Sequence, residues 1–440
     1  MINTIKQKFE SKNAIIGIIG LGYVGLPFAT TYTQKGFRVI GYDVSKEKVD
    51  LVNKGENYIG DVDDDVLKKA VNDGLFSATT NESELKNTDV IFICVPTPIT
   101  KNRVPDTRFM ESASKTALKA MSSGKIIVLR STTYPGTTEE LVLPILESTG
   151  YKLDKDFFLA FSPERIDPGN TTWTSDTTPI VVGGVSKKSG EMAEIVLKQA
   201  LPNVYKVSNA KVAEMEKLLE NIFRSVNIAL INEMAQMCDR MGDIDIWEVV
   251  DAAASKPFGF MPFKPGPGIG GHCILVDPYY LSWRAKGFDF HSQFIELAAK
   301  TNEDMPHYVR DLILRALSEN GKAVKESKII FLGVAFKKGV DDIRNSPAIR
   351  VMELLSEIGD PNIEFADPYV NEIRFNGTKL VAQNIDSTTI SNYDCVVITT
   401  DHDEFDRDMI AKNATVIVDT RNTLRNYKTI GNYYILGGGK

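Results

Sequence analysis

The sequence predicts an α/β protein with two doubly wound parallel sheets, and three observations support this prediction. Short apolar runs alternate with helical stretches between residues 14 and 207, and the alternation returns between residues 328 and 419. Between these regions, residues 208–241 contain neither Gly nor Pro, which favours one long helix. Runs that are apolar throughout are typical of strands buried on both faces. We therefore expect two Rossmann-like domains joined by a long central helix and further helices.

Composition excludes several classes of protein. The 440 residues are 43% hydrophobic and 25% charged, as in globular proteins, and the net charge of -7 predicts no nucleic-acid or anionic-membrane partner. No apolar run approaches the ~20 residues of a membrane span, and residues 1–13 lack the apolar core of a signal peptide. Four unpatterned cysteines fit a reducing compartment, and no Cys/His spacing indicates a metal site. We expect a cytoplasmic protein without a metal.

A glycine turn follows the first apolar run. Residues 14–19 are AIIGII, residues 20–25 are GLGYVG, and a helical stretch and a second apolar run ending at Asp43 come next. This order of strand, glycine turn, helix, strand and acid is the dinucleotide-binding pattern. An acid at Asp43 can bind both ribose hydroxyls and would repel a 2′-phosphate, which favours NAD over NADP. The expected cofactor contacts here are Gly20, Gly22, Tyr23, Val24, Gly25, Asp43 and Lys48.

Polar residues follow the next three apolar runs, where ligands of such sheets bind. Thr97 follows VIFICVP, Thr132 follows KIIVLRS, and Glu164 and Arg165 follow DFFLAFSP. Thr97 and Thr132 are candidates for contacting cofactor or substrate, although hydroxyl residues can merely cap turns. Glu164 and Arg165, at the exit of a strand, are expected to take part in chemistry and not merely to be solvated.

The long helix carries a polar stripe. Ser208 or Asn209 can begin it, Gly242 can end it, and its expected length is about 50 Å. Lys217, Asn221 and Arg224 share one face of this helix. A solvated face is the plain alternative, but apolar neighbours favour the wall of a pocket. A Lys beside a thiol would stabilise a negative oxygen and the thiolate.

A Gly- and Pro-rich loop, FKPGPGIGGHCILVDPYY, runs from residue 263 to residue 280 and includes Gly268. Such a loop bends tightly and exposes backbone to a ligand. Cys94, Cys238 and Cys395 lie in apolar or helical runs and suit buried positions, whereas Cys273 has no core to fill. Cys273 is therefore the candidate functional thiol, with Asp277 four residues later. The helical stretch over residues 288–319 is expected to be interrupted around Pro306.

The last region repeats the first. SKIIFLG and IEFADP, with an intervening helix, parallel the first strand, turn, helix and acid, and Asp367 takes the place of Asp43. We expect a second sheet with the same strand order but without the full glycine fingerprint. Phe336, Lys337, Arg344 and Arg421 follow its strands, and basic residues there suit a diphosphate.

Several motifs together resemble the UDP-glucose/GDP-mannose dehydrogenase family from end to end: GLGYVGLP, VPTP, RSTTYPGTT, SPERIDPGN, GPGIGGHCILVDPYYL and FKKGVDDIRNSP. The resemblance implies an NAD-binding Rossmann-like domain (1–207), a central helical and dimerisation domain with the Cys loop (208–318) and a UDP-sugar-binding Rossmann-like domain (319–440). It also implies a homodimer that oxidises the C6 alcohol of a nucleotide sugar to a carboxylate with two NAD.

The resemblance also implies roles for individual residues. Cys273 would attack the aldehyde from the first oxidation, and water would hydrolyse the resulting thioester after the second. Lys217 and Asn221 would stabilise oxyanions, Asp277 would orient Lys217 or water, and Thr132 and Glu164 would position water. The implied substrate contacts are Glu164, Arg165, Ile166, Lys217, Asn221, Arg224, Lys264, Gly268, Phe336, Lys337 and Arg421, with Arg344 reaching cofactor and substrate.

The sugar is predicted from one stretch. The form SPERxDPGN at residues 162–170 is similar to enzymes for UDP-N-acetylglucosamine or its galactose epimer, so UDP-N-acetylglucosamine is the expected substrate, and surface-polysaccharide synthesis is the expected role. The epimeric UDP-N-acetylgalactosamine and UDP-N-acetylmannosamine, and UDP-glucose, stay as alternatives. A two-electron hydroxyacid-type dehydrogenase and a non-catalytic NAD-binding protein are rival interpretations.

Overall fold

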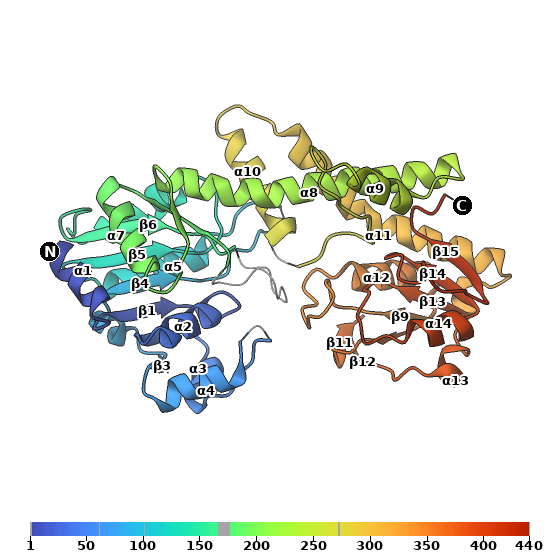
Figure 1. Ribbon diagram of the computed structural model, residues 1–440, viewed down its shortest axis with the longest axis horizontal. Coiled ribbons are helices and arrows are strands. Elements are labelled where there is room, and N and C mark those ends of the chain that lie inside the picture. The colour runs from blue at the N-terminus through green and yellow to red at the C-terminus, as the bar shows by residue number, and fades with distance from the viewer. Residues whose placement is uncertain (1, 61, 101, 166–176, 272, 440) are drawn as a thin grey trace. The chain divides into compact units, whose positions relative to one another are not determined.

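The computed structural model describes residues 2–60, 62–100, 102–165, 177–271 and 273–439 (Figure 1). The chain divides into two compact units. One comprises Met1–Glu220 and Tyr279–Phe290, and the other comprises Asn221–Pro278 and His291–Lys440. Among the described helices, none has the length and apolar character needed to cross a membrane.

The first unit is built on an eight-stranded sheet of order β3-β2-β1-β4-β5-β6-β7-β8. Its pairings are parallel except that of β6 with β7. The order reverses between β1 and β4, and ligands of open α/β sheets bind at such a point, beyond the carboxyl ends of the strands. The strands are β1 (Ile15–Ile19), β2 (Arg38–Tyr42), β3 (Phe76–Thr79), β4 (Val90–Ile93), β5 (Lys125–Leu129), β6 (Phe157–Phe161), β7 (Ile180–Gly184) and β8 (Val204–Lys206).

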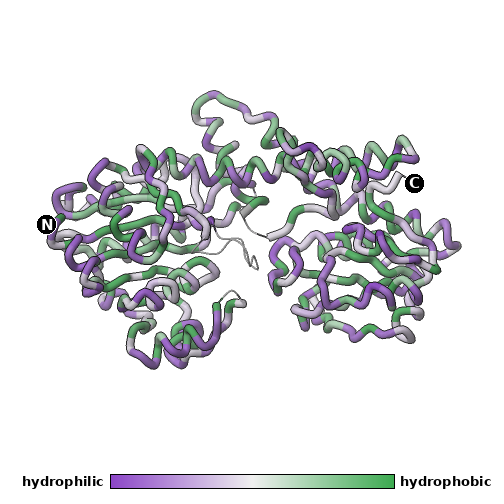
Figure 2. The backbone as a smooth tube through the Cα atoms, viewed as in Figure 1, coloured by the Kyte–Doolittle hydropathy of each residue, from purple (hydrophilic) through white to green (hydrophobic). Residues whose placement is uncertain are grey.

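Both faces of this sheet are covered, which explains the uninterrupted apolar runs. Along β5, Ile126 and Val128 belong to the core on one face, while Ile127 and Leu129 belong to the core on the other. The tube in Figure 2 shows the strands as mainly hydrophobic. The helices of this unit are α1 (Ile2–Glu10), α2 (Gly25–Gln34), α3 (Lys46–Lys54), α4 (Asp64–Asn72), α5 (Arg108–Lys119), α6 (Leu143–Glu147) and α7 (Lys187–Leu197).

The second unit contains a five-stranded parallel sheet of order β10-β9-β13-β14-β15. The corresponding strands take the same order as in the first sheet, as predicted. Within the described residues, however, β10 is an edge strand, whereas its counterpart β2 pairs with β3; an antiparallel hairpin, β11 with β12, follows β10 instead. The strands are β9 (Lys328–Leu332), β10 (Asn362–Ala366), β11 (Glu372–Phe375), β12 (Thr378–Val381), β13 (Cys395–Ile398), β14 (Val416–Asp419) and β15 (Asn432–Ile435).

The predicted long helix is α8 (Ala210–Met241), which has 32 residues. The Asn209 side chain accepts the Val212 N–H at 3.0 Å at its start, and Gly242, with φ of 75°, follows its end. The division between the units falls within α8, after Glu220. The predicted α/β class with two parallel sheets and a central helical region is confirmed.

The predicted interruption around Pro306 is wrong. Helix α11 (Gln293–Glu319) continues through Pro306 for 27 residues. Pro306 is buried, and packing of the whole helix against the second sheet outweighs the one backbone hydrogen bond that a proline removes. The other helices of the second unit are α9 (Ile246–Ala254), α12 (Pro347–Gly359), α13 (Ser387–Ile390) and α14 (Arg407–Asn413). Helix α10 (Cys273–Lys286) is divided between the two units, after Pro278.

Candidate active site

The glycine turn between β1 and α2 has three different steric requirements. A Cβ on Gly20 would lie 2.4 Å from the Cys94 carbonyl oxygen, and Gly20 has a positive φ of 93°. A Cβ on Gly25 would lie 1.8 Å from the Gly20 carbonyl oxygen, so only glycine lets α2 pack on the turn. A Cβ on Gly22 would meet nothing within 4 Å. Gly22 is therefore the position where another molecule can approach bare backbone.

Asp43 stabilises this turn from the end of β2. Its Oδ2 accepts the Leu21 N–H at 2.8 Å, its Oδ1 accepts the Ser45 N–H at 2.9 Å, and the Lys48 Nζ lies 3.9 Å from Oδ2. Each oxygen thus accepts one backbone hydrogen bond and keeps capacity for a hydroxyl donor. The Tyr58 hydroxyl, which sequence reasoning missed, donates to the Leu21 carbonyl oxygen at 2.6 Å. The turn and the acid fit a dinucleotide with a free 2′-hydroxyl.

The exits of β4 and β5 are tied together by Ser131. Its hydroxyl donates to the Val95 carbonyl oxygen at 2.8 Å and accepts the Val95 N–H at 2.9 Å. Thr97 is buried and Thr132 is half-buried beside these bonds. Both predicted contact residues therefore lie at the carboxyl edge of the sheet, where a cofactor on the glycine turn would end.

Glu164, at the exit of β6, is bound to an arginine that sequence reasoning missed. The Arg130 Nη2 donates to Glu164 Oε2 at 2.5 Å, and the Arg130 side chain is fully buried. The sequence carried one signal for this pair: an arginine directly follows the apolar run KIIVL. A charged side chain at the end of a buried strand is rarely buried without a partner of opposite charge. Glu164 is therefore held as part of an ion pair.

Arg165 is turned toward α8. Its guanidinium pairs with Glu220 and lies 3.6 Å from a Glu216 oxygen, and it donates to the Pro179 carbonyl oxygen at 2.6 Å. Burial and the adjacent Glu220 raise the pKa of Glu216. Arg165 thus anchors α8, on which Lys217 is buried. Ile166, also a predicted contact, lies outside the described residues.

Glu214 of α8 is a second buried charged residue near the predicted site that sequence reasoning missed. It is fully buried and accepts the N–H groups of Gly136 and Thr138 at 2.6 and 2.9 Å, and the Thr138 hydroxyl at 2.6 Å. Burial raises its pKa to about 7, although these donors oppose the rise. Glu214 connects α8 to the loop that follows Thr132.

In the second unit, α8 contributes Asn221, which lies one turn after Lys217 in the helix. The Asn221 Nδ2 donates to Asp277 Oδ2 at 2.5 Å, and both side chains are buried. Asp277 therefore holds the Asn221 amide in place. Arg224 is exposed, so the predicted stripe divides into two buried residues and a surface one.

Cys273 is the first residue of α10, directly after the glycine-rich loop, and its side chain lies outside the described residues. The other three cysteines are buried and unpaired, which confirms the prediction for them.

The glycine-rich loop packs against the turn that follows β9. A Cβ on Gly270 would lie 2.4 Å from Phe336 Cβ, and one on Gly268 would lie 3.3 Å from the Pro347 Cβ. The Gly271 N–H donates to the Arg344 carbonyl oxygen at 2.8 Å. The predicted Phe336 and Arg344 are thus brought to this loop, and the Arg344 guanidinium binds Asp342.

Three further predicted cations lie at different places in this unit. Arg421 is half-buried against the loop, because a Cβ on Gly266 would lie 2.6 Å from its Nη1, and its Nε donates to the Thr399 carbonyl oxygen at 2.9 Å. Lys337 is half-buried in the turn after β9. Lys264 is exposed, with its Nζ 3.5 Å from Asp251. No three Cys, His, Asp or Glu side chains in the described part of the chain are placed to hold a metal ion.

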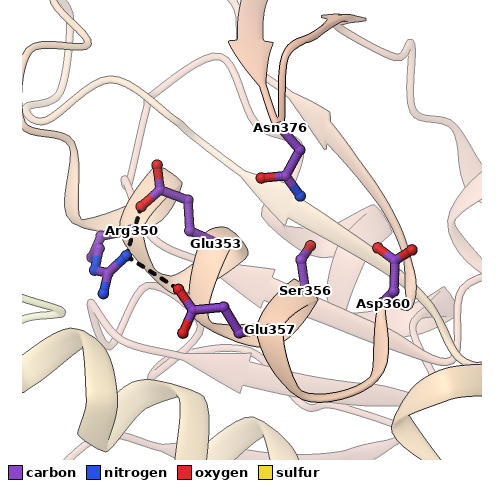
Figure 3. A pocket seen from close by; sticks show the side chains of 6 residues that line it. All are labelled: Arg350, Glu353, Ser356, Glu357, Asp360 and Asn376. Carbon is purple, nitrogen blue, oxygen red and sulfur yellow. Dashed lines mark hydrogen bonds and ion pairs between the residues drawn. The ribbon is translucent and has the colours of Figure 1, made fainter.

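A separate depression of about 290 Å³ lies on α12 of the second unit (Figure 3). Arg350 pairs there with Glu353 at 2.8 Å and with Glu357 at 3.7 Å. The remaining lining residues are Ser356, Asp360 and Asn376. Its one cation is thus bound by carboxylates, and no residue predicted for the site lines it.

A dinucleotide-binding turn in one sheet domain and a cysteine-bearing loop packed on a second sheet domain define a nucleotide-dependent dehydrogenase of the Rossmann type. The chain belongs to the UDP-glucose/GDP-mannose dehydrogenase family. The NAD binding domain of that family matches residues 14–201, its central domain matches 211–304, and its UDP binding domain matches 330–426. The protein is an NAD-dependent nucleotide-sugar dehydrogenase.

Similar proteins cover nearly the whole chain. Protein CapL of Staphylococcus aureus is 36% identical over 89% of this chain and 91% of its own length. UDP-N-acetyl-D-glucosamine 6-dehydrogenase of Salmonella typhi is 34% identical over 89% of this chain and 90% of its own length. The structure of UDP-D-ManNAc dehydrogenase from Pyrococcus horikoshii matches with a TM-score of 0.87 and 32% identity, over 97% of this chain and 99% of that one.

Proposed function

We propose that the protein oxidises the C6 hydroxyl of a UDP-N-acetylhexosamine, with UDP-N-acetylglucosamine as the best candidate, to the uronic acid in two NAD-dependent steps. The observation that carries this proposal is Cys273, which begins α10 directly after the glycine-rich loop. A two-electron alcohol dehydrogenase has no use for a nucleophile at that place. A four-electron enzyme needs one to convert an aldehyde into a thioester.

In the first oxidation, Lys217 holds the C6 oxygen and receives its proton, and Asn221 donates a hydrogen bond to the same oxygen. Asp277 fixes the Asn221 amide, which is the bond seen at 2.5 Å. NAD on the glycine turn supplies the hydride acceptor for each oxidation. Its contacts are Gly20, Gly22, Tyr23, Val24, Gly25, Asp43, Lys48, Thr97 and Thr132, with Arg344 from the last domain.

In the second oxidation, the Cys273 thiolate adds to the aldehyde carbon, and the resulting oxyanion is held by Lys217 and Asn221. After the second hydride leaves, a thioester joins Cys273 to C6. Glu164 and Thr132 position the water that hydrolyses this bond, which releases the carboxylate and the thiol. Each sugar therefore consumes one water and yields two NADH.

The second sheet domain holds the UDP moiety in this proposal. Gly268 and Phe336 offer backbone and ring surface, and the cations that would neutralise the diphosphate or contact the nucleotide are Lys264, Lys337 and Arg421. Arg165, Ile166 and Arg224 complete the proposed substrate contacts. The proposed organisation is an NAD domain (1–207), a central dimerising domain (208–318) and a UDP-sugar domain (319–440), in a cytoplasmic homodimer that serves surface-polysaccharide synthesis.

The choice of sugar follows from the stretch SPERIDPGN at residues 162–170 and from the Salmonella typhi relative named for the glucosamine sugar. UDP-N-acetylmannosamine is the second candidate, because the Pyrococcus horikoshii structure that matches with a TM-score of 0.87 is named for the mannosamine sugar. Both substrates carry the same C6 hydroxyl group and would be oxidised by the same steps, because they differ only in the sugar ring.

NADH released per sugar consumed tests the proposal with UDP-N-acetylglucosamine, UDP-N-acetylgalactosamine, UDP-N-acetylmannosamine and UDP-glucose. We expect two NADH per sugar and a preference for the first. Cys273→Ser should abolish formation of the acid, whereas Cys238→Ser, at a buried cysteine of α8, should retain it. One NADH per sugar, or full turnover to the acid by Cys273→Ser, would contradict the thioester route.

A further inference from the structure

Arg130 and Glu164 form an ion pair at the carboxyl ends of β5 and β6, the edge of the sheet at which the reaction is proposed to occur. Arg130 follows β5 and Glu164 follows β6, two neighbouring parallel strands. The Arg130 side chain is fully buried, while the Glu164 side chain is 19% exposed. The pair therefore has an inner cation and an outer carboxylate, which is the member that a ligand at the sheet edge can reach.

The arginine is fixed by more than its partner. Its guanidinium carbon lies 3.9 Å from the centroid of the Phe28 ring in α2, and its Nη1 lies 3.5 Å from the Ser162 hydroxyl oxygen. The Ser162 hydroxyl in turn donates to the Val181 carbonyl oxygen at 2.8 Å. A cation stacked on a ring and removed from water has little freedom to leave its carboxylate.

The carboxylate is held on both oxygens. Glu164 Oε2 accepts from Arg130 at 2.5 Å, and Oε1 accepts the Arg165 backbone N–H at 2.8 Å. A carboxylate that accepts hydrogen bonds from these donors is favoured in its ionised form. Such a group accepts a hydrogen bond from water or a hydroxyl and is a poor proton donor.

Among the residues that the structure describes, two other titratable groups near the pair do not compete with it. Cys94 at the exit of β4 and Tyr32 in α2 both sense the Arg130 charge, and burial raises the pKa of Cys94 to about 12 and raises that of Tyr32. Both are neutral where a carboxyl group titrates. The Arg165 guanidinium pairs with Glu220 and Glu216 of α8 instead.

We propose that Arg130 is a positioning residue for the dehydrogenase reaction: it keeps Glu164 ionised and fixes its two oxygens, so that Glu164 orients water as a hydrogen-bond acceptor. This proposal rests on the role given to Glu164 in the proposed function. In this proposal Arg130, whose side chain is fully buried, acts through Glu164.

The test is the pH profile of kcat/KM for NADH formation. Arg130→Gln removes the charge but keeps a similar length, and its acid-side inflection should move upward by about 1 to 3 pH units, because a carboxyl group without its cation protonates earlier. Arg130→Lys should restore much of the wild-type position. Glu164→Gln should remove the inflection, and adding Arg130→Gln to it should cost little more.

Lys125→Met is the matched control. Lys125 begins the same strand, is equally buried, and donates to the Leu85 and Thr88 carbonyl oxygens far from the carboxyl edge. Its loss should lower folding stability without moving the pH inflection. An Arg130→Gln profile that coincides with the wild-type profile, or a loss of stability alone as in Lys125→Met, would overturn the proposal.

A double-mutant cycle separates this inference from the proposed function. If the wild type oxidises no UDP-sugar, the proposed function fails, and unfolding of Arg130→Gln, Glu164→Gln and the double variant still measures the pair. Coupling that is present at pH 7 and lost as the carboxylate is protonated supports the ion pair as the controlling interaction. Absence of coupling at pH 7 contradicts it.

Discussion

The two sheet domains place an acid at the same point but use it differently. Asp43 and Asp367 each follow the second strand of their sheet, and the Oδ2 of each accepts an N–H from the turn after the first strand, Leu21 at 2.8 Å and Val334 at 2.7 Å. Asp43 accepts one further backbone N–H, from Ser45. It therefore keeps acceptor capacity for the hydroxyl groups of a ribose.

The Asp367 carboxylate has no acceptor capacity left for the hydroxyl groups of a ribose. It also accepts the N–H groups of Ala335, Tyr369 and Val370, and the His402 Nε2 lies 3.3 Å from its Oδ2, with both side chains fully buried. The His402 Nδ1 accepts the Gly339 N–H, so the ring spans from the acid to the turn. The second domain uses its acid to fold its own turn, and a ribose cannot be bound there in the manner of the first domain.

The glycine turns differ in the same sense. Gly333 passes as close to its neighbour as Gly20 does, since its Cβ would lie 2.5 Å from Thr400 Cβ. Two residues later the second domain has Ala335 where the first has Gly22, and α12 begins only at Pro347. Both turns therefore have a glycine, Gly20 or Gly333, where the backbone passes close to a neighbouring strand end. Only the first turn has a second glycine, Gly22, against which a dinucleotide could lie.

The largest effect should come from Gly25→Ala. A Cβ there meets the Gly20 carbonyl oxygen at 1.8 Å, so α2 must move off the turn, and we expect a loss of about 4 kcal/mol in the free energy of unfolding. Thermal unfolding followed by circular dichroism measures this loss.

Gly22→Ala is the control within the same turn. Because a Cβ there meets nothing within 4 Å, stability should be unchanged, while NAD affinity should fall on the order of tenfold. Wild-type NAD affinity in Gly22→Ala would show that the cofactor does not lie against this glycine.

Two buried carboxylates should give the domains opposite responses to pH. Burial raises the pKa of Glu214 from 4.5 to about 7, so its stabilising contribution is full below pH 4.5 and is lost as the pH rises through 7, by up to about 3 kcal/mol. Burial alone would raise the pKa of Asp367, but His402, Tyr369 and Ala335 hold it below its ordinary value. Its contribution is present at neutral pH and is lost in acid.

Hydrogen exchange resolved by peptide can measure the two responses separately. Between pH 5 and 7, protection near residues 136–142 should fall with rising pH, and Glu214→Gln should flatten this trend. Protection near residues 334–339 should fall only in more acidic solution, and Asp367→Asn should remove that acid limb. Parallel trends in the two segments would contradict the comparison.

Replacing each acid by its amide should separate ligand binding from folding. Asp367→Asn leaves buried N–H groups without an acceptor and should cost about 2 kcal/mol of stability. Asp43→Asn should cost less stability but should weaken NAD relative to NADP, because the charge that disfavours a 2′-phosphate is gone. Calorimetric titration with both cofactors checks this difference; equal cofactor effects in the two variants would refute it.

The smallest change in stability and in cofactor binding is expected from replacing Lys48. Its Nζ lies 3.9 Å from Asp43 and its side chain is 40% exposed, so Lys48→Ala should change stability by less than about 0.5 kcal/mol. The KM for NAD should change only slightly. A large rise in that KM would show that Lys48 binds the cofactor directly.

Much of this architecture could be predicted from local patterns. The strand, glycine turn, helix and acid around Gly20 and Asp43 follow one another in sequence, and so does the helix that Asn209 begins and Gly242 ends. The local cost of Pro306 within a helix predicts an interruption, whereas the packing that outweighs this cost comes from the second sheet. The roles of Arg130 and Glu214 could not be predicted from the sequence, because their hydrogen-bond partners are 34 and 76 to 78 residues away along the chain.

By itself, the sequence determined which segments become strands, where the dinucleotide turn lies and which cysteine stands outside an apolar run. These features depend on side-chain periodicity and on the conformational range of Gly and Pro, which are properties of short segments. Only the tertiary structure decided that Arg130 pairs with Glu164, that Asn221 binds Asp277 and that His402 approaches Asp367. Each of these pairings satisfies a buried polar group, and burial exists only once distant segments have packed together.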